Sequence, residues 1–112
     1  MKNFLFVYRS EPNRNQPSPE EMQANMKRWL DWIGNIAAQD KLVDGGSGLQ
    51  AAGKLVKQNT IVTDGPYTEI KEVVAGYSIV KATSIEEAAS LADGCPIFNV
   101  GGSVEVREIN MM

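Results

Sequence analysis

The segment from Asp64 to Glu72 is the part of this chain richest in residues that could take part in chemistry. Its ionisable side chains are those of Asp64, Tyr67, Glu69, Lys71 and Glu72. A carboxylate that is buried beside unlike charge can have its pKa tuned for acid or base work. The simpler interpretation is a solvated turn on which Lys71 pairs with a neighbouring glutamate, because structural ion pairs are common at turns. The residues favour the turn and leave the catalytic alternative open.

The first three residues of this segment, Asp-Gly-Pro from Asp64, are typical of a turn, with Asp64 as its cap. A loop that joins two strands is also a place where binding groups collect, and Asp64 is a ligand candidate if the loop borders the sheet. We therefore predict a pocket bounded by this loop. Tyr67 would supply a flat contact and Lys71 a charge, and Trp29 of the first predicted helix would form a second wall.

The chain contains no histidine. This absence removes the usual general base, the commonest metal ligand and any Ser-His or Cys-His nucleophile pair. The single cysteine, Cys95, follows a predicted helix, whose dipole disfavours a thiolate there, so we expect a buried and unreactive thiol. No EF-hand spacing is present, and the glycine-rich run 45–48 lacks the Lys-Ser/Thr of a phosphate loop. The sequence therefore predicts no cofactor and no dedicated metal site.

The composition is that of an ordinary globular protein, with 43% hydrophobic and 22% charged residues in 112. We expect one domain over residues 1–112. Eleven scattered basic residues stand against fourteen acidic ones, which argues against direct nucleic-acid binding. The apolar stretch 4–8 is too short to cross a membrane. One unpaired cysteine fits a reducing compartment, so the cytoplasm is the expected location.

The first forty residues predict a strand and a helix. In the strand over residues 2–9, Phe4, Phe6 and Tyr8 alternate with Leu5 and Val7, so both faces are apolar and a central place in a sheet is expected. A capping box at 18–21, with proline at the first helical position, starts the helix. One apolar stripe is expected to pack on the sheet; it consists of Met22, Met26, Trp29, Leu30, Ile33, Ile36 and Ala37. Trp32 is displaced from the centre of this stripe, so we expect it to meet a neighbouring chain or the edge of a pocket.

The remaining residues predict a linker at 44–48, two short strands within 49–63 and a strand over 73–82. Gly76, inside that strand, would let another part of the molecule approach its backbone closely or let the strand bend. A second capping box at 84–87 starts a short helix, a loop follows at 97–102, and a one-sided strand covers 104–107. Arg9 and Arg107 would be neighbours if the first and last strands pair, and they would bind an anion or, as is commoner, pair with Glu105 or Glu108.

This order predicts an α+β protein, a ferredoxin-like βαββαβ sandwich with an antiparallel sheet. Two helices cover one face of such a sheet only. The other apolar face would be exposed unless a second copy packs on it, so we expect a homodimer.

The stretch Asp-Gly-Pro-Tyr-Thr-Glu-Ile-Lys-Glu at 64–72, followed by Gly76-Tyr77, resembles the signature of the DGPF subgroup of the YCII-related family. The opening strand, the first helix start, Cys95-Pro96 and the last strand are also similar to that subgroup. The resemblance implies a dimeric α+β barrel, and it implies an association with extracytoplasmic-function sigma factors. Relatives in the wider superfamily include enzymes with a His-Asp pair, which this chain lacks.

Two hypotheses on function follow. The first is a dimeric small-molecule-binding or accessory module, tied to transcriptional regulation through the sigma-factor association. The alternative is a small enzyme of lyase or hydrolase type that acts on a small acidic or aromatic compound, with Glu69, Glu72 or Tyr67 transferring the proton. A ligand that is bound unchanged favours the first hypothesis, and turnover favours the second.

Overall fold

The computed structural model describes the backbone of residues 1–11, 17–58, 60–65 and 73–111, without the side chains of 60–65. The elements, in chain order, are β1 (Lys2–Ser10), α1 (Pro19–Ala38), β2 (Leu42–Gly48), β3 (Gly53–Lys57), β4 (Thr60–Gly65), β5 (Val73–Ala82), α2 (Ile85–Leu91), the 3-10 helix η1 (Pro96–Val100) and β6 (Ser103–Glu108). Among these described helices, none is long and apolar enough to cross a membrane.

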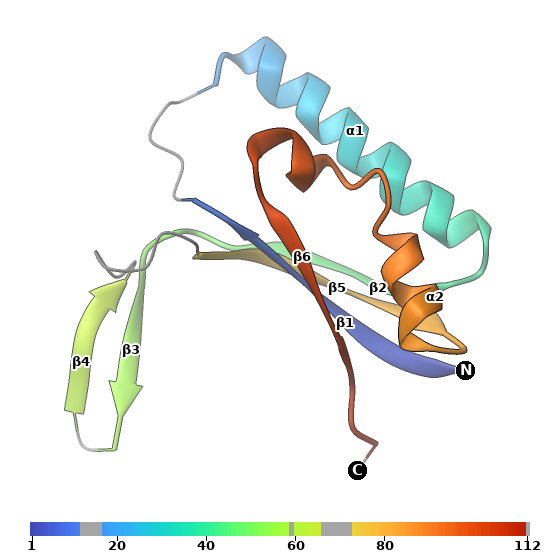
Figure 1. Ribbon diagram of the computed structural model, residues 1–112. Helices are drawn as coiled ribbons and strands as arrows, with labels where there is room; N and C mark the ends of the chain where they lie inside the picture. The colour runs from blue at the N-terminus through green and yellow to red at the C-terminus, as the bar shows by residue number, and fades with distance from the viewer. Residues whose placement is uncertain (12–16, 59, 66–72, 112) are drawn as a thin grey trace.

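Four of the strands form an antiparallel sheet in the order β2-β5-β1-β6. Both helices lie on one face of this sheet (Figure 1). This arrangement confirms the predicted ferredoxin-like fold and the central place of the first strand. The predicted hairpin is the separate pair β3-β4, inserted between β2 and β5, and Figure 1 shows it standing away from the four-stranded sheet.

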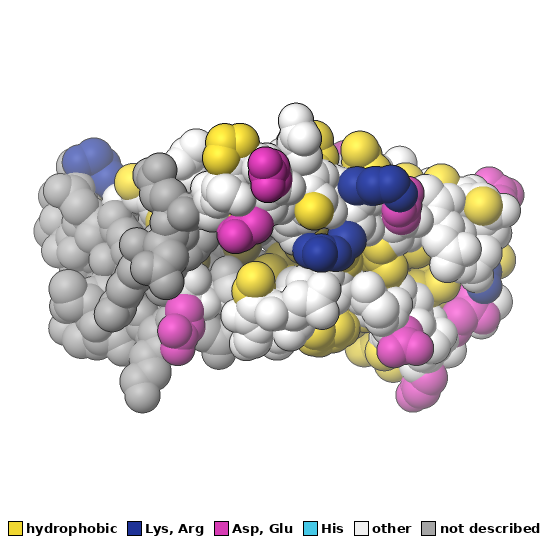
Figure 2. Space-filling view, turned by 90° about the horizontal axis from the view of Figure 1, so that it is seen from above, with side chains coloured by type: hydrophobic (Ala, Val, Ile, Leu, Met, Phe, Trp, Pro, Cys, Tyr) yellow, Lys and Arg dark blue, Asp and Glu magenta, His cyan; other side chains and the backbone are white. Residues whose placement is uncertain are grey.

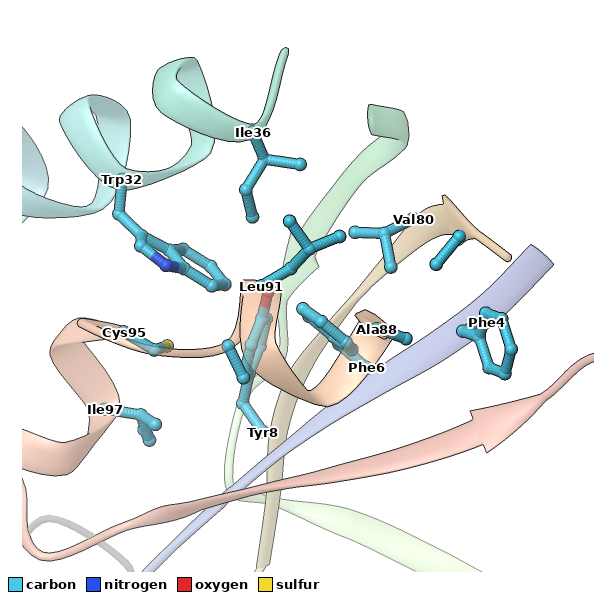
Figure 3. Packing of buried hydrophobic residues seen from close by; sticks show 12 residues of the cluster. Phe4, Phe6, Tyr8, Trp32, Ile36, Val80, Ala88, Leu91, Cys95 and Ile97 are labelled. Atoms are coloured by element: carbon cyan, nitrogen blue, oxygen red, sulfur yellow. The ribbon is translucent and has the colours of Figure 1, made fainter. Parts of the chain in front are cut away.

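The core lies between the sheet and the helices. Phe4, Phe6 and Tyr8 of β1 point into it, as the alternating pattern predicts, and Val80 of β5 packs beside them (Figure 3). The prediction for Trp32 was wrong. Its ring stacks on that of Phe6 with centroids 6.3 Å apart, and its indole Nε1 donates a hydrogen bond of 3.1 Å to the carbonyl of Asp93. Trp32 is therefore a core residue rather than the edge of a pocket or a contact with another chain.

Helix α1 begins where the capping box predicts, with the Glu21 N–H donating to Ser18 Oγ at 3.1 Å. The predicted stripe, in contrast, packs on the sheet only in part. Its members Met22, Met26 and Leu30 are 56%, 65% and 65% exposed, and Ala37 is exposed too. The buried residues of α1 are Trp32 and Ile36, with Trp29 and Ile33 partly buried against the core. The C-terminal half of the helix thus covers the core, and the apolar side chains of its N-terminal half remain open.

The glycine-rich run predicted as a linker belongs to strand β2. It pairs with β5, with register shifts between Leu42 and Asp44 and between Asp44 and Ser47. Gly46 has a φ of +74°, and a Cβ built on it would lie 1.7 Å from the carbonyl oxygen of Tyr77. A Cβ on Gly76 would lie 2.7 Å from the Ser47 carbonyl oxygen, which confirms the predicted close approach. Because Gly46 and Gly76 have no side chains, β2 can pair closely with β5 even though the ladder of hydrogen bonds between them is irregular.

From β5 onwards, the described residues follow the predictions with one exception. Ser84 caps α2 by accepting the Glu87 N–H at 3.1 Å. Residues 96–100 form the 3-10 helix η1 where the sequence predicts a loop at 97–102. Strand β6 pairs with β1, and the side chains of both Arg9 and Arg107 approach the Glu105 carboxylate, at 2.9 Å and 3.9 Å. The two guanidinium groups thus share one glutamate, so the commoner of the two predicted alternatives, pairing with Glu105, is the one the structure has, and the anion site is not.

Candidate functional site

A groove of about 1030 Å³ runs between the N-terminal half of α1 and the strands β2 and β5. One wall is formed by the helix from Glu21 to Ile33. The floor is formed by residues 45–48 of β2 and 75–78 of β5, and Val100 of η1 borders the groove as well. Clefts of several hundred cubic ångströms with apolar linings are the usual binding places of small molecules, so this groove is the candidate site.

Glycine residues form most of the β2 part of the groove floor. Three of the four β2 residues in it are Gly45, Gly46 and Gly48, which put no side chain into the space. The bulged backbone is fixed by the Gly46 N–H, which donates to the Asp44 carboxylate at 2.8 Å. The run that resembles a linker in the sequence is therefore the surface over which a ligand would lie.

The helix wall is apolar. Met22, Met26 and Leu30, the exposed part of the predicted stripe, all line the groove. Figure 2, which looks at the molecule from the side of α1 in Figure 1, shows hydrophobic side chains open to solvent among charged ones on this face. Methionine side chains are flexible and polarisable, so they can adapt to ligands of different outline.

Three aromatic rings meet beside this wall. The centroid of Trp29 lies 4.9 Å from that of Tyr8 and 5.7 Å from that of Trp32, with interplanar angles of 74° and 83°. Trp32 and Tyr8 are buried, while Trp29 is partly exposed and lines the groove. The edge-to-face contacts with Tyr8 and Trp32 hold the Trp29 ring in place. The exposed part of the ring remains available for contact with a flat molecule.

The polar part of the groove is a short hydrogen-bonded chain between strands. The Tyr8 hydroxyl donates to Ser78 Oγ at 2.7 Å, and the Ser78 hydroxyl donates to the Gly45 carbonyl oxygen at 2.7 Å. All three residues line the groove. Burial is the main influence on the pKa of Tyr8 and raises it well above its usual value, although the hydrogen bond with Ser78 lowers it. Burial therefore favours the neutral phenol of Tyr8 over the phenolate.

Few charged groups border the groove. Within the described lining these are Glu21 and Arg28 of α1, both exposed. The described residues contain no cluster of three or more His, Cys, Asp or Glu side chains that could hold a metal ion. Cys95 lies in the core, and burial raises the pKa of its thiol to about 11. Its predicted burial is confirmed.

The predicted site residues fall into two groups. Trp29 lines this groove, whereas the predicted pocket bounded by residues 64–72 involves side chains outside the described residues and stays a prediction. Tyr67, Glu69, Lys71 and Glu72 lie outside the described residues. So does the side chain of Asp64, whose backbone pairs with Lys54 in the β3-β4 hairpin. The sequence interpretation missed the site roles of Tyr8 and Ser78, the glycine floor and the role of the methionines. The signal for Tyr8 was the alternating pattern of the first strand, and the signal for the methionines was the helical spacing of the predicted stripe.

Comparison with known proteins identifies the family. The model of the YCII-related domain matches residues 1–112, so the chain belongs to this family. A comparison with curated proteins found no match. Among solved structures, the chain is similar to 5-chloro-2-hydroxyhydroquinone dehydrochlorinase from Burkholderia phenoliruptrix AC1100, in a complex with 2,5-dihydroxybenzoquinone. The TM-score is 0.51 and the identity 17%, over 98% of this chain and 95% of that chain. At this identity the likeness shows the fold alone.

Proposed function

We propose that this protein binds a small molecule with a flat, largely apolar body in the groove between α1 and the strands β2 and β5. The observation that carries the proposal is the combination of an open apolar helix wall with a floor of glycines. Three large hydrophobic side chains, Met22, Met26 and Leu30, are more than half exposed, and all of them line the same cavity. Apolar side chains grouped in one concave place are the usual mark of a binding site.

The size of the groove supports a ligand of one or two rings. Its volume of about 1030 Å³ exceeds what one aromatic ring needs, and Trp29 offers a surface for stacking. The dehydrochlorinase of similar fold is described in complex with a dihydroxybenzoquinone, which is a flat molecule of one ring. That likeness adds support by analogy, whereas the proposal rests on the groove itself.

The direct experiment is to incubate the purified protein with a metabolite extract and identify what it retains by mass spectrometry. Met26→Gln is the informative variant, because the side chain is 65% exposed and its replacement spares the fold. Val56→Gln is the matched control, since Val56 is 67% exposed on the hairpin and does not line the groove. We expect Met26→Gln to lose the retained compound and Val56→Gln to keep it. Equal retention by both variants would overturn the proposal.

The same experiment distinguishes binding from catalysis. A retained compound that is recovered unchanged supports a binding or accessory role. A compound that is converted supports the alternative, a small lyase or hydrolase whose proton transfer would be assigned to Tyr67, Glu69 or Glu72. Loss of turnover without loss of ligand retention in Glu69→Gln or in Glu72→Gln would then support that alternative.

We infer further that the working form is a homodimer joined through the sheet face that the helices leave open. In the sheet register, Leu5 pairs with Ile79 and Val7 with Tyr77, and all four are only partly buried on that face. Apolar residues at the middle of a sheet favour a second layer over solvent. Light scattering at micromolar concentration should give twice the chain mass of 12.2 kDa; a monomer would contradict the inference.

The cellular setting is proposed from the resemblance to the DGPF subgroup. It supports a cytoplasmic accessory module beside an extracytoplasmic-function sigma factor, in which the bound molecule would act as the signal. Co-purification of such a factor with the protein, dependent on the retained compound, is the expected result.

A further inference from the structure

We propose that the Tyr8–Ser78–Gly45 chain makes the groove select ligands that donate a hydrogen bond, such as phenols and hydroxyquinones, over ligands that can only accept one. This inference rests on the proposed function of the groove and adds the chemistry that its polar part recognises. It concerns a specificity-determining residue, Tyr8, rather than a catalytic one.

The direction of the two hydrogen bonds is fixed by chemistry. A carbonyl oxygen cannot donate, so the Ser78 hydroxyl must give its single proton to Gly45 across the 2.7 Å contact. Ser78 Oγ then has no proton left for Tyr8, so the Tyr8 hydroxyl must be the donor in the second 2.7 Å contact. Both protons are committed within the protein, and these two side chains present lone pairs alone to the groove.

The surroundings keep this arrangement in place. Ser78 is 1% exposed and Tyr8 5% exposed, so bulk water competes little for either hydroxyl, and Tyr8, the less buried of the two, is the one that a ligand in the groove would meet. The Tyr8 ring is also held by its edge-to-face contacts with Trp29 and Trp32. A hydroxyl group carried by a ring that stacks near Trp29 can donate to Tyr8 Oη and extend the chain. An ether or ketone oxygen at the same place would face a lone pair and lose its own hydration without compensation.

The test compares phenol with its methyl ether, anisole, as defined probes. Dissociation constants are measured by NMR from the indole N–H signal of Trp29, which suits weak ligands. The test depends on the ratio of the dissociation constant for anisole to the dissociation constant for phenol. We expect this ratio to be about tenfold higher in the wild type than in Tyr8→Phe, the factor of one neutral hydrogen bond. Tyr8→Phe keeps the ring and its aromatic contacts, so circular dichroism should show an unchanged fold.

Ser78→Ala provides an independent second variant. It removes the acceptor of the Tyr8 proton, which is then free to point into the groove. We expect acetophenone, which can only accept, to bind Ser78→Ala several-fold more tightly than the wild type. A phenol preference that is the same in wild type and Tyr8→Phe, or acetophenone binding unchanged by Ser78→Ala, would overturn the inference while the groove remains a binding site. If neither phenol nor anisole shifts the Trp29 signal, the proposed function itself fails.

Discussion

The glycine floor makes a quantitative prediction for Gly46→Ala. The left-handed backbone at Gly46, with a φ of +74°, costs an alanine about 1–2 kcal/mol. Its Cβ would also stand 1.7 Å from the Tyr77 carbonyl oxygen, a backbone atom that cannot rotate away. Strand β2 must therefore move from β5, which would break one or two hydrogen bonds at about 1 kcal/mol each. We expect a loss of about 2–4 kcal/mol in the free energy of unfolding.

The assay is urea unfolding followed by tryptophan fluorescence. For a protein of this size, a loss of that magnitude lowers the midpoint by about 1–2 M urea. Gly45→Ala is the matched control, because Gly45 is the adjacent floor residue, has no positive φ and would place its Cβ in open space. Its midpoint should be unchanged or slightly raised. If Gly46→Ala unfolds at the same urea concentration as Gly45→Ala, the structure assigned to β2 is wrong.

Two further predictions concern titratable groups. Hydrogen bonds from Thr83, the larger influence, and the nearby Lys41 ammonium lower the pKa of Glu87 below its ordinary value of 4.5. The contribution of the ionised Glu87 to stability is therefore present above the unfolded-state pKa, and it is lost as the pH falls from about 5.5 towards 3. Glu87→Gln should consequently show a smaller acid-induced drop in melting temperature than the wild type. Equal drops in the two proteins would contradict this. Because burial raises the pKa of Cys95 to about 11, about one thiol in a thousand is ionised near pH 8, and a disulfide reagent should modify the protein only after unfolding. Rapid stoichiometric modification of the native protein would show that Cys95 is accessible.

The sequence predicts the fold where independent local signals agree. Ser18 and Ser84 each stand three residues before a glutamate whose N–H they accept, and both predicted helices begin there. The apolar pattern on both faces of residues 2–9 likewise predicts a central strand, and β1 lies between β5 and β6. These features depend on neighbours in the chain, so they can be recognised without knowledge of the tertiary structure.

The site was harder to predict because it depends on contacts between distant residues. Helical periodicity specifies that Met22, Met26 and Leu30 share a face, but it does not say whether an element lies under that face. The glycine run of β2 predicts a linker because glycine is rare in strands, yet the close pairing with β5 requires glycine at position 46. The hydrogen bond between Tyr8 and Ser78 joins residues 70 positions apart, and it runs diagonally between neighbouring strands, where Tyr8 pairs with Gly76 and Phe6 with Ser78.

The most direct test of the central claim is an NMR titration of the protein labelled with 13C in the methionine methyl groups, with 2-naphthol as the added ring compound. Met22 and Met26 line the groove, while Met1 and Met111 lie outside its lining and report non-specific effects. We predict that the methyl signals of Met22 and Met26 shift to saturation with one common dissociation constant, and that those of Met1 and Met111 stay in place. Shifts of Met22 and Met26 that grow without saturation together with those of Met1 and Met111, or no shift in Met22 and Met26, would contradict a binding site in this groove.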